Sequence, residues 1–262
     1  MTLRSPLMVW LAAWLGLSGC ATVVSPPSAP QATAAQADSA WSRVLKRFVN
    51  ERGEVDFSAL AQDRTDLDRY VRFVADTPLD GFSDRDQRLA HMINAYNALS
   101  MFNVIESGIP ATHAGLKKVT FFVLRKLSVG GQSLSLYAFE NDVIRPFTRE
   151  IGEPRVHFAL NCSARSCPAL PTMPFTAAAL SSELERETRA FFARSENFRI
   201  DEATRTVWLN EILNFYPEDF VPAHGSSLIA FANRYAPRAG LLDYSVRFTP
   251  YDWTVANSRR VP

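Results

Sequence analysis

The sequence predicts an α+β fold in which one long central helix packs on a small, mainly antiparallel sheet, with further helices around it. The segment 84–107 has the apolar spacing of a single long helix. Helical patterns occupy both ends of the chain, and the strand-like segments between them are close enough to pair mainly as hairpins. This order favours an α+β fold over a doubly wound α/β fold.

Residues 1–19 have the features of a bacterial lipoprotein signal peptide. Arg4 supplies a positive region, the apolar stretch 7–17 is too short to span a bilayer comfortably, and the LSGC sequence that ends at Cys20 resembles a lipobox. An ordinary cleaved signal peptide and an uncleaved anchor helix are the alternatives. Acyl chains on Cys20 would hold a folded domain at a membrane surface. By resemblance to the enterobacterial sorting rule, Ala21 indicates the outer membrane, with the domain facing the periplasm.

Residues 20–37 contain no charged residue and no periodic pattern, which predicts a flexible, lipid-anchored tether. The segment 38–262 shows no second linker and no internal repeat, so we expect a single domain there. The chain carries 28 Lys and Arg against 27 Asp and Glu without a long basic run, which argues against a nucleic-acid partner. A glycine-rich phosphate loop and the common zinc-protease and α/β-hydrolase motifs are absent from the sequence. We therefore expect no cofactor and no metal.

Each further element follows from its local pattern. Amphipathic spacing beside capping residues predicts helices at 38–50, 65–77, 84–107, 136–144, 174–195, 210–220 and 226–235. Runs of β-branched and aromatic residues next to turn signals predict strands at 118–124, 126–129, 156–160, 198–200, 206–209 and 244–248, and a loop at 146–154.

Two amides interrupt the long helix. Asn94 and Asn97 lie three residues apart on a stripe beside its apolar face. Buried polar groups must find hydrogen-bond partners. We expect both side chains to fix the backbone of a neighbouring loop or, alternatively, to bind a substrate directly.

The stretch 154–171 has the most functional character, because a short apolar strand runs into a loop that carries Cys162 and Cys167 beside Arg165. Two nearby cysteines in an oxidising compartment favour a disulfide. The alternative is that Cys162 is a thiolate nucleophile that requires a base and an oxyanion hole. A metal site is disfavoured because two thiols and one strand histidine lack a clear fourth ligand.

The base nearest to Cys162 in the sequence is His157, but strand alternation would place the two side chains on opposite faces. His157 is therefore either a core residue or a base. Glu140 is an acidic candidate on the helix 136–144. Asp252 lies between two aromatic residues that could bury a carboxylate and raise its pKa, and the plainer interpretation is a cap or an arginine partner.

Five ordered blocks resemble the domain-of-unknown-function 547 family: INAYNAL at 93–99, RVHFALNC at 155–162, SCP at 166–168, FYPEDF at 215–220 and PYDWT at 250–254. The resemblance runs from about residue 55 to residue 257. It implies an exported or lipid-anchored protein, and an arrangement loosely similar to papain and transglutaminases, with a central helix on an antiparallel sheet. It implies no particular activity.

The chain departs from the family pattern at one position. Where many members read Ile-Glu-His, this sequence reads Phe139-Glu140-Asn141. If that histidine is a catalytic base, this protein has lost it. If the histidine only orders a neighbouring loop, Asn141 can make the same kind of hydrogen bond.

Two functions follow. The first is a binding or scaffold protein of the cell envelope, with a cleft lined by Asn94, Asn97, His157 and the cysteine loop, for an envelope protein or peptide. The second is a cysteine hydrolase or acyltransferase that acts on peptide or amide bonds, with Cys162 as nucleophile, His157 as base and Asn94 or Asn97 as an orienting or oxyanion group. A free Cys162 sulfur within about 4 Å of an imidazole nitrogen supports the enzyme. A closed Cys162–Cys167 bond supports the binding protein.

Overall fold

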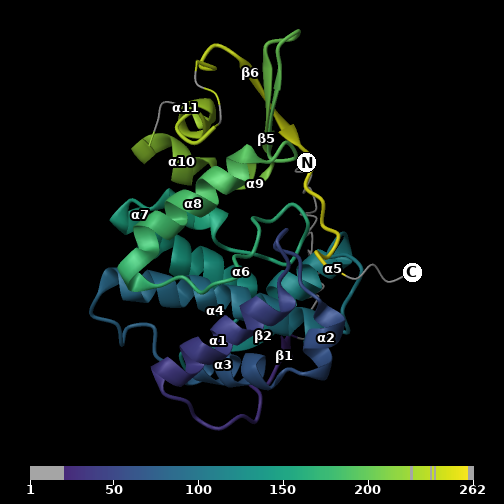
Figure 1. Ribbon diagram of the computed structural model, residues 1–262, viewed down its shortest axis with the longest axis vertical. Helices are drawn as coiled ribbons and strands as arrows, with labels where there is room; N and C mark the ends of the chain where they lie inside the picture. The colour runs from purple at the N-terminus through teal and green to yellow at the C-terminus, as the bar shows by residue number, and fades with distance from the viewer. Residues whose placement is uncertain (1–20, 225–226, 237, 239, 259–262) are drawn as a thin grey trace, which may run out of the picture.

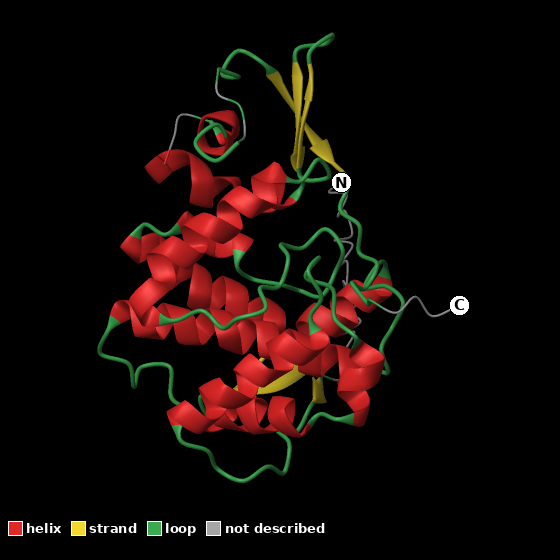
Figure 2. Ribbon diagram, viewed as in Figure 1, coloured by secondary structure: helices red, strands yellow, loops and turns green. Residues whose placement is uncertain are grey.

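The computed structural model describes residues 21–224, 227–236, 238 and 240–258. The α+β prediction is confirmed, since helices surround two three-stranded sheets, with strand orders β1-β2-β3 and β4-β5-β6 (Figure 2). Each sheet contains one antiparallel and one parallel pair, whereas the hairpin spacing predicts one mainly antiparallel sheet. The parallel partners β1 (Thr22–Val23) and β6 (Ser245–Thr249) are distant in sequence from the strands they join. Local patterns cannot anticipate such pairs.

Part of the segment predicted as a tether has regular structure. Strand β1 pairs with β2 (Arg125–Val129), and the backbone N–H of Val24 donates to the carbonyl of Lys126. Helix α1 (Ala34–Phe48) begins four residues before the predicted start at 38, because Thr33 and Gln36 form a capping box. The tether prediction is therefore wrong for these stretches, while residues 1–20, including Cys20, lie outside the described residues.

Helix α4 (Arg85–Glu106) is the centre of the larger core, as the sequence predicts. Every residue from 89 to 104 is buried, so the helix has no solvent-facing side over that length. It packs against α2 (Phe57–Gln62) and α3 (Thr65–Asp76), which lie beside α1 in Figure 1. No helix in the described part of the chain has the length and apolar character needed to cross a membrane.

The segment after α4 is helical where a strand is predicted. Residues 118–124 fall in α5 (Leu116–Val119) and the π-helix η1 (Thr120–Leu124). The side-chain amide of Asn103 donates to the carbonyl of Phe121 and holds this turn against α4. A short run of β-branched and aromatic residues fits a strand and a helix equally well. The strand prediction at 126–129 is confirmed by β2, which pairs with β3 (Gln132–Leu134).

The predicted helix at 136–144 continues further than expected. Helix α6 (Leu136–Ala138), the π-helix η2 (Phe139–Ile144) and α7 (Arg145–Ile151) follow one another directly. Pro146 lies in the first turn of α7, where a missing backbone N–H costs little. The loop prediction at 146–154 is therefore wrong as far as residue 151.

The predicted strand at 156–160 is also wrong. Residues Pro154–Phe158 form the 3₁₀-helix η3, which begins with a proline after Glu153, whose side chain accepts from the N–H of Arg155. The apolar run is buried among helices and has no partner strand, and apolarity alone cannot distinguish these cases. The alternation argument that separates His157 from Cys162 therefore does not apply.

The C-terminal part forms a second core around Phe158, Phe192 and Phe231. The predicted hairpin is confirmed by β4 (Phe198–Asp201) and β5 (Thr206–Asn210), and β6 joins β5 in parallel. This sheet projects at one end of the molecule (Figure 1), where α8 (Leu180–Ala193) packs on β4 and α9 (Ile212–Phe215) packs on β5. Helix α10 (Pro217–His224) packs on α11 (Leu228–Ala232), and η4 (Ala177–Ala179) packs on α4.

Candidate functional site

A cavity of about 290 Å³ lies beside the cysteine loop. Its wall combines the central helix, the π-helices η1 and η2, the loop after η3, α9 and the C-terminal segment. Aromatic rings dominate the lining, and only a few polar groups enter it. The aromatic and polar lining residues are Tyr96, Lys118, Phe122, Tyr137, Glu140, His157, Phe215, Tyr216, Tyr251 and Trp253.

One part of the wall is a disulfide between Cys162 and Cys167, with an S–S distance of 2.09 Å. The Cys167 sulfur accepts hydrogen bonds from the Tyr251 hydroxyl and from the backbone N–H of Cys162, both at 3.0 Å. The loop is fixed further by Asn161, whose side chain accepts from the N–H of Ser163 and donates to the carbonyl of Pro168. Cys162 thus carries no thiol, and its loop is rigidly held.

His157 lines the same cavity and is bound to a carboxylate. Its Nε2 lies 2.7 Å from Oδ2 of Asp219, and its ring stacks on Tyr216 with the centroids 4.8 Å apart. Asp219 also accepts from Arg145 at 2.8 Å and from Arg149. Burial acts to raise the pKa of Asp219, but the hydrogen bonds from His157 and the two arginines outweigh it and hold that pKa well below its usual range. Asp219 is therefore a carboxylate that orients the His157 ring.

Glu140 is the acidic group of the cavity. Its Oε2 accepts from the hydroxyl of Tyr96 at 2.9 Å. Burial first, and the nearby Glu140 carboxylate second, raise the pKa of both Tyr96 and Tyr216. Within the described ranges, no lysine, arginine or histidine nitrogen lies within 4.0 Å of the Glu140 carboxylate. The carboxylate is hydrogen-bonded to a hydroxyl and has no cationic partner among the described residues.

The mouth of the cavity is formed by the exposed helix α5 and the start of η1. The Lys118 ammonium lies 3.9 Å from the Trp253 ring centroid and 5.5 Å from that of Phe215. Burial lowers the pKa of Lys118, although the charge of Glu211 acts in the opposite direction. Three apolar lining residues are unusually exposed here: Val119 at 48%, Val123 at 40% and Tyr137 at 52%.

The two amides of α4 bind backbone groups. Asn94 accepts from the N–H of Phe175 and donates to its carbonyl, while Asn97 donates to the carbonyl of Ala159 and accepts from the N–H of Asn161. Neither residue lines the cavity beside the disulfide. Their geometry matches loop fixation rather than substrate contact.

Arg165 and Asp252 lie outside this cavity, and both are exposed. The backbone N–H of Arg165 donates to the carbonyl of Thr254, and Asp252 accepts from the N–H of Thr254. The idea that flanking aromatic rings bury Asp252 is therefore wrong, because its side chain caps a turn at the surface. Asn141 accepts from Arg145 and donates to the carbonyl of Tyr137.

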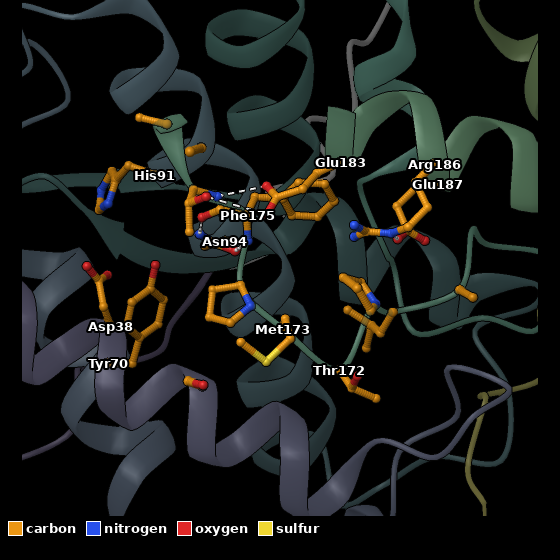
Figure 3. Close-up of a pocket in the computed structure, with 18 of the residues that line it drawn as sticks. Asp38, Tyr70, His91, Asn94, Thr172, Met173, Phe175, Glu183, Arg186 and Glu187 are labelled. Atoms are coloured by element: carbon orange, nitrogen blue, oxygen red, sulfur yellow. Dashed lines mark hydrogen bonds and ion pairs between the residues drawn. The ribbon is translucent and has the colours of Figure 1, made fainter. Parts of the chain in front are cut away.

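A larger groove of about 1320 Å³ runs between α1, α4, α8 and the segment 169–177. Asn94 and Phe175 lie in its wall, with His91 on one side of the view and Arg186 with Glu187 on the other (Figure 3). His91 is 8% exposed, and its Nε2 has no hydrogen-bond partner. Burial lowers the pKa of His91 to about 4.

A family model matches a region of the chain that includes part of the lining of the cavity beside the disulfide. Residues 79–192 match the family described as "Protein of unknown function, DUF547". The match supports the family resemblance over this region. The DUF547 region contains Tyr96, Glu140, His157 and both cysteines, whereas the cavity residues from 212 onward lie beyond it. No curated protein and no solved structure matches the chain significantly.

Several cavity residues are not identified as site residues by sequence reasoning: Tyr96, Lys118, Tyr216, Tyr251 and Trp253. All but Lys118 belong to the blocks at 93–99, 215–220 and 250–254 that resemble the family, and these blocks are the available signal. Among the residues with described positions, no group of three or more His, Cys, Asp or Glu side chains is arranged to hold a metal ion.

Proposed function

We propose that this protein is a ligand-binding protein of the cell envelope and that its site is the 290 Å³ cavity beside the disulfide. The observation that carries the proposal is the closed Cys162–Cys167 bond, which turns the cysteine loop into a fixed wall without a nucleophile. A concave, mainly aromatic cavity with a few convergent polar groups is the usual form of a small-molecule site.

The wall is held in place before any ligand arrives. Asn97 ties the segment before the cysteines to the central helix, and the hydroxyls of Ser100 and Ser163 lie 2.9 Å apart across the same interface. A site that is already ordered loses little conformational entropy on binding. This rigidity supports binding rather than a transient scaffold contact.

The proposal includes membrane attachment through acylated Cys20, with the outer membrane and the periplasmic side as the expected location. The lipobox-like sequence supports it. Mass spectrometry of the mature protein tests it directly, since the first residue is then a lipidated Cys20. A Cys20→Ala variant is expected to leave the membrane fraction.

The binding site is tested with a neutral fluorescent probe, N-phenyl-1-naphthylamine, titrated into the oxidised protein. We expect one probe per chain, and we expect Leu160→Phe to reduce its affinity, because Leu160 lines the cavity and a larger side chain fills it. Leu242→Phe makes the same change at a side chain that is 63% exposed and serves as the control. Equal binding by both variants would place the probe elsewhere and remove the site.

The second candidate is a cysteine hydrolase, which the His157–Asp219 pair in the wall that contains Cys162 favours. It requires that a dithiol reductant first converts the disulfide into two thiols and is itself oxidised to a disulfide. Iodoacetamide labelling read by mass spectrometry separates the candidates. We expect Cys162 to be labelled only after dithiothreitol treatment, and labelling without reductant would favour the enzyme.

A further inference from the structure

We infer that the cavity binds a substituted ammonium group, held among its tyrosine and tryptophan rings with Glu140 as the counter-charge. This inference rests on the proposed function, because it names the ligand class of the same site. Three features of the cavity carry it: a carboxylate without a cation, a cluster of aromatic rings, and an ammonium group of the chain itself on those rings.

The first feature is the charge of Glu140. The side chain is half-buried in a cavity wall and accepts from the Tyr96 hydroxyl, but none of the cations described in the structure pairs with it. A carboxylate removed from water without a compensating charge is unfavourable. A positively charged ligand group would provide this charge, whereas an anionic ligand would be repelled.

The second feature is the ring cluster. The ring centroids of Tyr251 and Trp253 are 4.5 Å apart, and Phe215 lies 5.3 Å from Tyr251 and 6.2 Å from Trp253. Tyr96 and Tyr216 extend the aromatic wall toward Glu140. Aromatic faces attract weakly hydrated organic cations, tryptophan most strongly. A hard metal ion would need several oxygen ligands, which this wall does not offer.

The third feature is Lys118. Its ammonium lies 3.9 Å from the Trp253 ring centroid, so the outer part of the cavity already accommodates a primary ammonium. Lys118 belongs to the exposed helix α5, no residue of which is buried, while the rings belong to segments fixed by hydrogen bonds. A ligand ammonium can therefore displace Lys118 from the rings or lie deeper, beside Glu140.

The experiment compares choline with 3,3-dimethyl-1-butanol, its uncharged isostere, by isothermal titration calorimetry on the oxidised protein. We expect choline to bind at least about tenfold more tightly, because the two molecules share shape and differ in charge. Equal affinities would overturn the inference while leaving a neutral-ligand site intact. If both molecules and the naphthylamine probe fail to bind, the proposed function itself is wrong.

The matched variants are Glu140→Gln and Glu150→Gln, which remove the same charge inside and outside the cavity. Glu150 is exposed on α7 and does not line the cavity. We expect Glu140→Gln to weaken choline binding about tenfold with no change for the isostere, and Glu150→Gln to change neither. If Glu140→Gln leaves choline binding unchanged, the counter-charge role of Glu140 is wrong. The comparison of choline with its isostere on the wild-type protein does not depend on the folding of either variant.

Two sources of the ammonium group can be distinguished with two further probes. Tetramethylammonium represents a small quaternary amine, and N-acetyl-lysine methylamide represents the lysine side chain of a peptide. Tighter binding of the first indicates a free quaternary amine, and tighter binding of the second indicates a peptide amine. Binding of neither, together with equal affinities for choline and its isostere, would overturn the inference.

Discussion

The groove between α1 and α8 and the cavity beside the disulfide differ in the groups that line them as well as in size. The groove between α1 and α8 is the larger, but its polar groups mostly have partners within the chain: Asn94 binds the backbone of Phe175, Glu183 accepts from the N–H of Thr176, and Arg186 pairs with Glu187. The cavity beside the disulfide is smaller and contains Glu140, whose carboxylate pairs with no cation in the described part of the chain. Volume alone would select the groove. Asp38 in the groove also has no cation among the described ion pairs, and burial raises its pKa, so it is the combination of Glu140 with the tyrosine and tryptophan rings that selects the smaller cavity.

The polar groups that support the two walls also differ in burial. Asp219 holds His157 in the cavity wall. Its side chain is 4% exposed, and its carboxylate contacts His157 and two arginines. Glu183 supports the groove side and is partly exposed. Loss of a buried ion-pair member leaves its partners without compensation, while loss of an exposed one does not.

The largest effect is expected for Asp219→Ala. Arg145, with 8% of its side chain exposed, and His157 would lose their buried carboxylate, so the free energy of unfolding should fall by about 3 kcal/mol. Glu183→Ala is the matched groove variant, with an expected loss of about 0.5 kcal/mol. Urea unfolding measures both. Similar decreases in the free energy of unfolding for the two variants would show that the cavity wall and the groove wall depend equally on these carboxylates.

An intermediate effect is expected for pH at the groove. Burial lowers the pKa of His91 to about 4, against 6.5 ordinarily, so the unfolded chain binds the proton more tightly than the folded chain. The stability from neutral His91 is present above pH 6.5 and is lost as the pH falls toward 4. At pH 5.5 the expected loss is about 1 kcal/mol.

His91→Phe should remove this part of the pH dependence, because phenylalanine does not titrate and can keep the ring contacts with Phe73 and Phe82. His113, whose pKa burial also lowers to about 4, contributes a second part and remains in the variant. Urea unfolding at pH 7.5 and pH 5.5 measures the difference. An unchanged pH dependence in His91→Phe would mean that protonation of His91 does not lower the free energy of unfolding.

The elements that could be predicted from the sequence are those whose signals lie within a few neighbouring residues. The helix at 84–107, the hairpin around 201–206 and the cysteine pair could all be predicted, since each follows from spacing, caps or turns within a few residues. The segment 156–160 could not, because a short buried apolar run has no periodicity that separates a strand from a 3₁₀-helix.

The candidate site could be predicted only in part, because most of its contacts join residues that are far apart in the sequence. Its cysteine wall is local, but Tyr96 and Glu140 are 44 residues apart, and Tyr251 reaches Cys167 across 84 residues. Such contacts depend on how helices and loops pack, which a single sequence does not encode in any local pattern. The blocks at 215–220 and 250–254 that resemble the family include Tyr216, Tyr251 and Trp253, but the sequence does not indicate that these rings line one cavity.

The smallest effect is expected at the mouth of the cavity. If Lys118 occupies the Trp253 ring in the absence of ligand, Lys118→Met removes a competitor and should tighten tetramethylammonium binding about threefold, less than the tenfold effect at Glu140. Lys117→Met removes the same charge from the same helix, where no ring contact of the residue exists among the described interactions, and should leave the affinity nearly unchanged. Equal tightening by both variants would indicate general charge repulsion at the mouth. Weaker binding in Lys118→Met would contradict the competitor role, because methionine keeps an apolar chain of similar length and lacks only the ammonium.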